Sequence, residues 1–137
     1  MNHQPLTDLL EELATAAGCA SFWHGKRSAM NINYNEPFPQ AHLFLMPSQL
    51  KGGAITTQVA MCFYGKDEHE NGSEQSIAIQ NEMDVLTQRF HAAFAEQDDV
   101  ELVGDTMERV PVLRQGAGIG TGYFVNFTLT HLAQCRP

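Results

Sequence analysis

The sequence predicts an α+β domain: an antiparallel sheet of about four to five strands with two helices packed on one face, in the order α-β-β-α-β-β. Two segments repeat apolar residues at the spacing of an amphipathic helix, and several others alternate apolar and polar residues, as half-buried strands do. Strands that lie close together in sequence favour antiparallel pairing. The chain has 137 residues, 43% hydrophobic and 18% charged, which suits one globular domain and is short for two. We therefore expect residues 1–137 to form a single domain.

The first helix is expected over Leu6–Ala17. Thr7 is suited to cap its start, and Gly18 is suited to end it. Its apolar residues recur on one side of a helix and are Leu6, Leu9, Leu10, Leu13, Ala16 and Ala17.

A brief strand is expected next, over the apolar and aromatic segment Cys19–Trp23. The following stretch, Lys26–Gln40, contains three asparagines and two prolines, which disfavour a helix and favour turns. We interpret it as a long excursion with little regular structure, and long loops of this kind usually serve contacts.

Two strands joined by a short loop are expected after this excursion. Ala41–Met46 is apolar and is closed by Pro47. Along Ala54–Tyr64 the odd positions Ile55, Val59, Met61 and Phe63 are apolar, while Thr56 and Gln58 lie on the other face, as expected for a half-buried antiparallel strand. The glycine pair Gly52-Gly53 lies between them, so the two strands are expected to form a hairpin.

The second half begins with the longest predicted element, a helix from Ser73 to about Gln97. Ser73 is suited to cap it, and its apolar stripe is Ile79, Met83, Leu86, Phe90 and Phe94. Val100–Val103 and Met107–Leu113 follow as two short strands or one bent strand. The glycine-rich stretch Gly116–Gly122 is interpreted as a flexible connection to a last alternating strand, Tyr123–Leu132.

The apolar stripes of these elements also predict the core. The residues expected to be largely buried are Leu9, Leu13, Val59, Met61, Phe63, Leu86, Phe90, Val125 and Phe127.

Charge and composition exclude several classes of partner. Eight Lys and Arg residues stand against sixteen Asp and Glu residues, for a formal net charge of −8. Such a surface repels phosphate, so neither specific nucleic-acid binding nor binding to anionic membranes is expected. The start, Met1–Thr7, lacks the layout of a signal peptide, and no apolar run approaches the ~20 residues that span a bilayer. We expect a soluble protein made in the cytoplasm.

The residues with reactive side chains form no recognisable catalytic or metal-binding motif. Cys19, Cys62 and Cys135 are separated by 43 and 73 residues, and no pair of histidines has helical ligand spacing. Asp67–Glu70 could hold a divalent cation, but a solvated acidic turn is the better interpretation. The glycine run lacks the context of a phosphate-binding loop. No catalytic residue, metal or cofactor is therefore expected, and the thiols are expected to be reduced and not catalytic.

Two segments are predicted to make protein contacts, the excursion around Arg27–Phe38 and the loop around Arg114–Gly122. Aromatic residues near the first either form an interface or pack beneath the loop, and we favour the interface. The scarce cations Arg27, Lys51 and Arg114 are expected to meet the acidic stretches at residues 67–70 or 98–101 of a neighbouring copy. The residues selected as interface candidates are Arg27, Tyr34, Phe38, Arg114, Gly118 and Ile119.

The order of elements resembles that of the tail-completion and tail-terminator proteins of long-tailed bacteriophages, over nearly the whole chain. The similarity is carried by the opening helix at Leu6–Leu13, the strand end at Gln58–Gly65, the long second helix, and the closing strand at Gly122–Thr130. This resemblance implies a virion-assembly protein that is not an enzyme and uses no cofactor. It implies rings, commonly hexamers, that sit on the tail tube of the virion, terminate it and meet the head-side connector.

Two other classes of function stay open at this point. One is a small enzyme or ligand-binding domain on an α+β scaffold, which would have a pocket with converging polar groups. The other is a cytoplasmic adaptor that binds its partner through an exposed loop or an edge strand.

Overall fold

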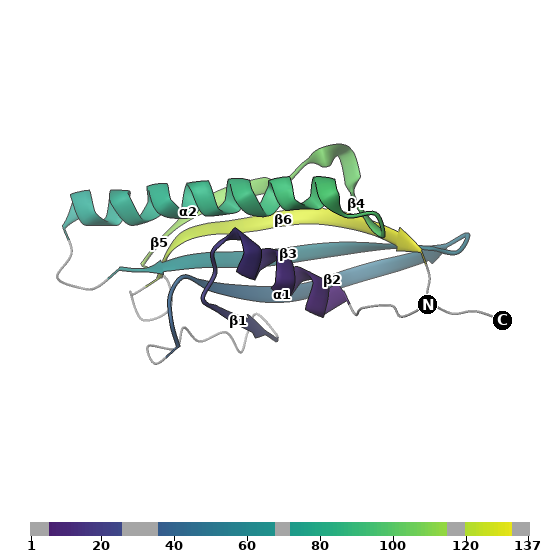
Figure 1. The fold of residues 1–137 in the computed structure, drawn as a ribbon, viewed down its shortest axis with the longest axis horizontal. Coiled ribbons are helices and arrows are strands. Elements are labelled where there is room, and N and C mark those ends of the chain that lie inside the picture. The colour runs from purple at the N-terminus through teal and green to yellow at the C-terminus, as the bar shows by residue number, and fades with distance from the viewer. Residues whose placement is uncertain (1–5, 26–35, 68–71, 115–119, 133–137) are drawn as a thin grey trace.

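Six strands and two helices make up the part of the chain that the structure, a computed structural model, describes: residues 6–25, 36–67, 72–114 and 120–132 (Figure 1). Two short 3-10 turns, Phe94–Glu96 and Val103–Asp105, flank β4. In chain order the elements are α1 (Leu6–Ala17), β1 (Ser21–His24), β2 (Gln40–Lys51), β3 (Ala54–Lys66), α2 (Ser73–Ala93), β4 (Val100–Leu102), β5 (Glu108–Arg114) and β6 (Gly120–Leu132).

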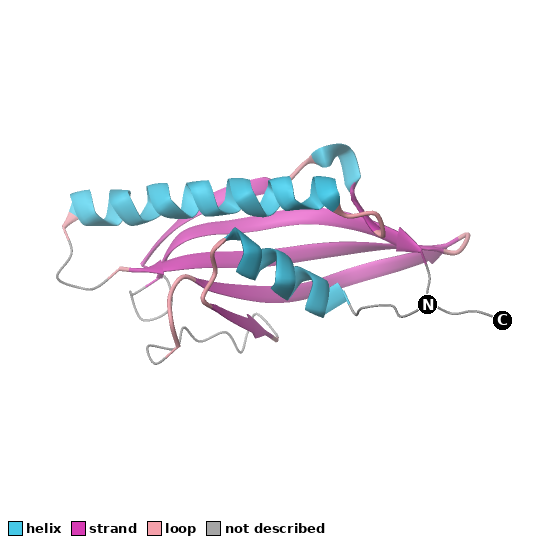
Figure 2. Ribbon diagram, viewed as in Figure 1, coloured by secondary structure: helices cyan, strands magenta, loops and turns pink. Residues whose placement is uncertain are grey.

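The strands form one mixed sheet in the order β1-β2-β3-β6, and both β4 and β5 pair with the far edge of β6. Every described pair is antiparallel except β1 and β2, which run parallel. Both helices lie on the same face of the sheet (Figure 2). The α+β class and the placement of the helices are confirmed. The finer prediction, an antiparallel sheet of about four to five strands in the order α-β-β-α-β-β, does not match the six-stranded mixed sheet.

The parallel pair explains the long excursion that the sequence places before β2. A parallel connection must carry the chain back along the sheet, and this needs about a dozen residues or more. The interval between His24 and Gln40 has that length. The parallel pairing thus requires a connection of this length, and the predicted contact role of residues 26–35, which lie outside the described residues, stays a prediction.

β2 does not end before Pro47, as predicted, but continues to Lys51. The register against β3 shifts between Leu45 and Ser48, so Pro47 lies at a bulge. β1 pairs only with residues 40–43 of β2, and Pro47 therefore lies where no described strand needs its missing N–H. The hairpin itself is confirmed, since Gly52 and Gly53 have φ values of 60° and 82°, suited to a two-residue loop.

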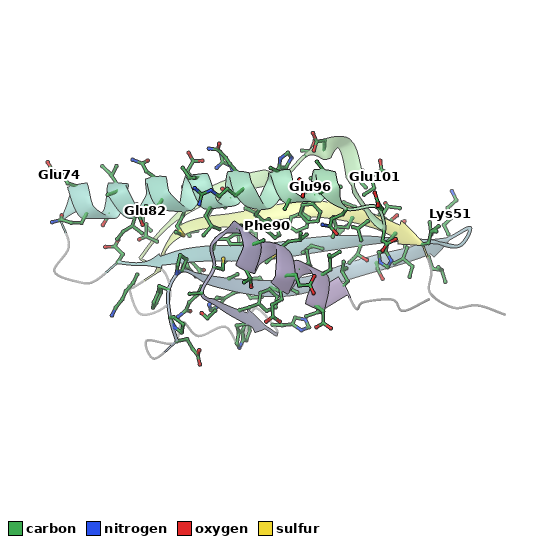
Figure 3. All side chains as sticks on the ribbon, in the orientation of Figure 1. Lys51, Glu74, Glu82, Phe90, Glu96 and Glu101 are labelled. Atoms are coloured by element: carbon green, nitrogen blue, oxygen red, sulfur yellow. The ribbon has the colours of Figure 1, made fainter. Side chains whose placement is uncertain are left out.

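The main core lies between the sheet and the two helices, with Phe90 of α2 near its centre (Figure 3). Eight of the nine predicted core residues are buried here. Leu9 is the exception, because α1 turns Leu10 and Ala14 into the core and leaves Leu9 half-buried. The apolar periodicity predicted the position of the helix correctly. It did not fully predict which residues of the helix are buried, since Ala14 is buried and Leu9 is only half-buried.

A second buried layer lies on the opposite face of the sheet. It contains Phe44 of β2 with Ala60, Cys62 and Tyr64 of β3. The half-buried side chains packed against this layer are Trp23, Phe38, Val112 and Phe124. β3 is thus buried on both faces from Val59 to Gly65, and the prediction of a half-buried strand is wrong for this part. An uninterrupted apolar run from Val59 to Tyr64 is the sequence signal for burial on both faces.

Three predicted boundaries also differ in the second half of the chain. α2 ends at Ala93 and continues only as a 3-10 turn. Its N-cap is Gly72 instead of Ser73, and the Gly72 N–H donates to the Gln75 side chain over 3.0 Å. β6 starts at Gly120, so Gly120–Gly122 belongs to a buried strand and not to the predicted flexible loop.

Candidate interaction surfaces

The predicted interface residues fall mostly outside the described part of the chain. Arg27, Tyr34, Gly118 and Ile119 lie there, and Arg114 is described only as the last residue of β5. Phe38 is described, and it packs half-buried against the second layer. The part of Phe38 that stays exposed leaves its predicted interface role a prediction.

A different surface gathers exposed aliphatic side chains, along the β4–β5 edge of the sheet. Val103 is 44% exposed, Val110 45% and Leu113 59%. Ile77 of α2 is 57% exposed and lies two turns before Asp84, a residue held by β5. Val110 and Leu113 are three residues apart on β5, so Val110 points to the face of the second layer, as Val112 does, and Leu113 to the helix face, as Arg109 does. We call these four residues, Ile77, Val103, Val110 and Leu113, which are spread over both faces of this edge, the apolar edge.

A polar clamp holds β5 to α2 beneath this edge. The Arg109 guanidinium donates to the Asp84 carboxylate and, over 3.0 Å, to the Thr87 hydroxyl. It also lies 4.9 Å from the centre of the Tyr123 ring, in cation–π geometry. Hydrogen bonding to Arg109 lowers the pKa of Asp84. Sequence reasoning missed this clamp, because its partners are 25 residues apart and share no motif.

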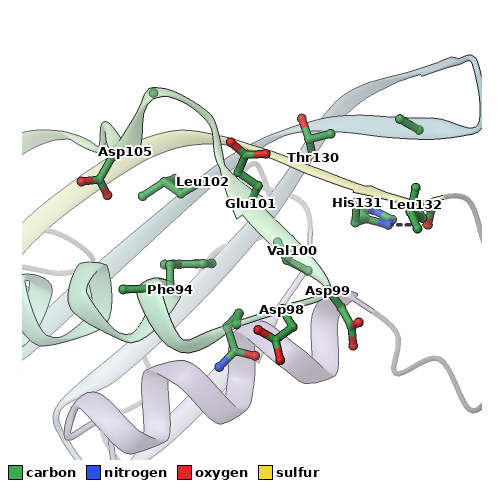
Figure 4. A pocket seen from close by; sticks show the side chains of 14 residues that line it. Phe94, Asp98, Asp99, Val100, Glu101, Leu102, Asp105, Thr130, His131 and Leu132 are labelled. Atoms are coloured by element: carbon green, nitrogen blue, oxygen red, sulfur yellow. Dashed lines mark hydrogen bonds between the residues drawn. The ribbon is translucent and has the colours of Figure 1, made fainter.

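An acidic groove of about 620 Å³ lies at the other end of α2, beside β4 (Figure 4). Asp98, Asp99 and Glu101 lie along it, and Phe94 and Leu102 contribute apolar surface. The predicted acidic stretch at residues 98–101 is therefore at the surface. Lys51, at the tip of the β2–β3 hairpin, lies toward the same end of the molecule (Figure 3).

Asp67 contradicts the predicted solvated acidic turn. Its side chain is completely buried, and its Oδ2 accepts hydrogen bonds from the Ser76 and Thr121 hydroxyls, each over 2.7 Å. Asp67 thus ties the end of β3 to the first turns of α2 and to the start of β6. It cannot serve as a surface contact for a neighbouring copy. The other residues of that turn, 68–70, lie outside the described residues.

We expect Asp67→Ala to lower the free energy of unfolding by roughly 1–3 kcal/mol, because two buried hydroxyls lose their common acceptor. Urea unfolding followed by circular dichroism measures the loss. Asp98→Ala is the matched control, since Asp98 is exposed in the acidic groove and should change stability by no more than about 0.5 kcal/mol. Equal effects of the two substitutions would contradict a structural role for Asp67.

The described cysteines are both buried. Burial raises the pKa of the Cys19 thiol to about 12, so this thiol is protonated at neutral pH. Within the described ranges, no three His, Cys, Asp or Glu side chains come together in a way that would hold a metal ion. No described helix is both long enough and apolar enough to cross a membrane. The absence of catalytic, metal and cofactor sites over the whole chain stays a prediction.

Comparison with models of protein families and with curated proteins finds no match to this chain.

Proposed function

We propose that this protein is a virion-assembly protein of the tail-terminator type. Copies associate side by side into a closed ring, with six subunits as the resemblance implies. The ring sits on the tail tube of a phage or phage-like particle, ends the tail there, and joins it to the head-side connector.

The apolar edge is the observation that carries this proposal. Edge strands have unpaired backbone groups, and an edge that also exposes aliphatic side chains favours association. Here Val110 and Leu113 lie on β5, which pairs only with β6 among the described strands. We propose that a second copy of the chain binds to this edge and covers it.

The opposite side of the subunit is unlike the apolar edge. It is formed by β1, the other outer strand of the sheet, with α1 beside it (Figure 1). Contact between two unlike sides of successive copies is the arrangement that closes into a ring. A contact between Lys51 of one copy and the acidic groove of the next does not fit this ring arrangement. Both lie toward the same end of the subunit, so their contact would favour a pair of copies related by a two-fold axis.

Side chains are expected to make the contact, instead of a strand added to β5. Pro111 lies in the middle of β5 and has no N–H to offer a partner strand, a common protection of edge strands. The net charge of −8 on every copy opposes association, so apolar contact must supply the affinity.

The test compares two valines with the same exposure. Val110 on the apolar edge and Val85 on α2 are each 45% exposed, and Val→Glu changes the net charge equally at both positions. We expect Val110→Glu to weaken self-association about tenfold or more, because a carboxylate enters an apolar contact between acidic copies. Val85→Glu should leave it unchanged. Native mass spectrometry and sedimentation over a concentration series measure both.

Two results would contradict the proposal. A chain that stays monomeric at every concentration, alone and with tail tubes, is not a ring-former. Equal effects of Val110→Glu and Val85→Glu would mean that the apolar edge is not the contact.

A further inference from the structure

His42 of β2 is a buried histidine, and one of its ring nitrogens has no partner among the described residues. The residue is 1% exposed and lies in the second layer, on the face of the sheet away from the helices. Its Nε2 is 3.0 Å from the Gln40 side-chain oxygen, and the Gln40 amide nitrogen donates to the Glu36 carbonyl over 3.2 Å. This chain of donors and acceptors assigns the proton to Nε2. Within the described residues, Nδ1 has no hydrogen-bond partner.

The side chains described around the His42 ring are mostly aromatic or apolar and would stabilise a positive charge on the ring only weakly. Trp23 of β1 packs at 5.5 Å between ring centres, and Tyr64 of β3 packs edge-on at 5.4 Å. Cys62 lies directly across from His42 in the strand register. Among the described residues of β3 on this face, the titratable side chains are Cys62 and Tyr64 beside the ring and Lys66 further along the strand, and β3 has no carboxylate there.

Protonation at Nδ1 would therefore place a charged N–H where no described acceptor receives it. Burial accordingly lowers the pKa of His42 from 6.5 to about 4. Because the folded state binds this proton less well than the unfolded chain, the neutral ring contributes its full stability above pH 6.5. That contribution is lost as the pH falls toward about 4.

β1 is the element that can detach from the sheet when His42 becomes protonated. It has four residues, pairs only with β2 among the described strands, and lies at the sheet edge. Trp23 joins it to the second layer by packing on His42 and, at 6.0 Å, on Phe44. Short edge elements of this kind open at lower cost than central strands.

We propose that His42 and Trp23 form an acid-sensitive latch that holds β1 on the sheet. Protonation of His42 at Nδ1 draws water to the ring and releases Trp23 together with β1, while β2, β3, β6 and the helices keep their structure. Release also uncovers the edge of β2 for strand pairing. The latch is a property of the folded subunit and does not depend on the proposed ring.

Trp23 is the single tryptophan of the chain, so its fluorescence reports on the latch directly. The experiment titrates the full-length protein from neutral to acid pH and follows acrylamide quenching of Trp23 beside far-UV circular dichroism. We expect quenching to rise toward the value of the urea-unfolded chain at a higher pH than the loss of helix signal. One transition that removes both signals together would overturn the proposal.

Two variants and one direct measurement complete the test. His42→Phe keeps an aromatic ring but cannot bind a proton, so the early rise in quenching should disappear. His24→Phe, at an exposed position of β1, is the matched control and should keep it. In the unaltered protein, nitrogen-15 NMR of the histidines should find His42 with its proton on Nε2 and titrating well below pH 6.5, whatever the variants do. An early transition that persists in His42→Phe, or a His42 that titrates like a free histidine, refutes the latch.

Discussion

Phe90→Ala is expected to lower the free energy of unfolding by roughly 3–5 kcal/mol. Phe90 is completely buried, and its ring centre lies 5.0 Å from that of Phe63, 5.3 Å from Phe94 and 5.8 Å from Phe127. These rings come from α2, β3, β6 and the turn after α2. Truncation therefore opens a cavity where the second helix meets the centre of the sheet.

Urea unfolding midpoints measure this loss, and Val85→Ala is the control on the same helix. Val85 is 45% exposed, so its truncation should change stability by no more than about 0.5 kcal/mol. If Phe90→Ala unfolded at the same midpoint as the parent chain, the assigned buried face of α2 would be wrong.

Gly122→Ala is expected to be at least as damaging, with a loss of about 3 kcal/mol or more, or no folded protein. A Cβ atom at this position would lie 1.8 Å from the carbonyl oxygen of Phe63. That oxygen belongs to the backbone of β3, which pairs with β6 along thirteen residues. Relief of the clash therefore requires separation of the two central strands.

Gly65→Ala separates this backbone clash from an ordinary crowded contact. A Cβ at Gly65 would lie 2.5 Å from the Ile79 side chain, which can be shortened. We expect the additional substitution Ile79→Ala to recover part of the stability lost in Gly65→Ala and none of that lost in Gly122→Ala. Thermal unfolding of the single and double variants measures the difference. Recovery in the Gly122 background would contradict the backbone origin of the effect.

Local patterns were enough to predict the elements but not the surfaces that they form. Gly122 illustrates the difference, because its sequence context suggested a flexible loop although the residue lies in a central strand. Asp67 is a second case. Its acidic sequence neighbours predict a solvent-exposed carboxyl group, and only the tertiary structure shows that Ser76 and Thr121 lie beside it and donate hydrogen bonds to it. The apolar edge combines Ile77 of α2 with residues of β5 and of the turn before it, and no spacing in the sequence brings these together.

The sequence by itself determined the two amphipathic helices, the β2–β3 hairpin and most of the main core. These features depend on residues close together in the chain, whose periodicity and turn preferences act before any tertiary contact forms. Only the tertiary structure decided the parallel pairing of β1, the second buried layer around His42, the burial of Asp67 and the apolar edge. Each of these depends on which strands become neighbours. That choice follows from the burial of whole sheet faces, and the preference of a single strand depends on the neighbours and the burial it finds there.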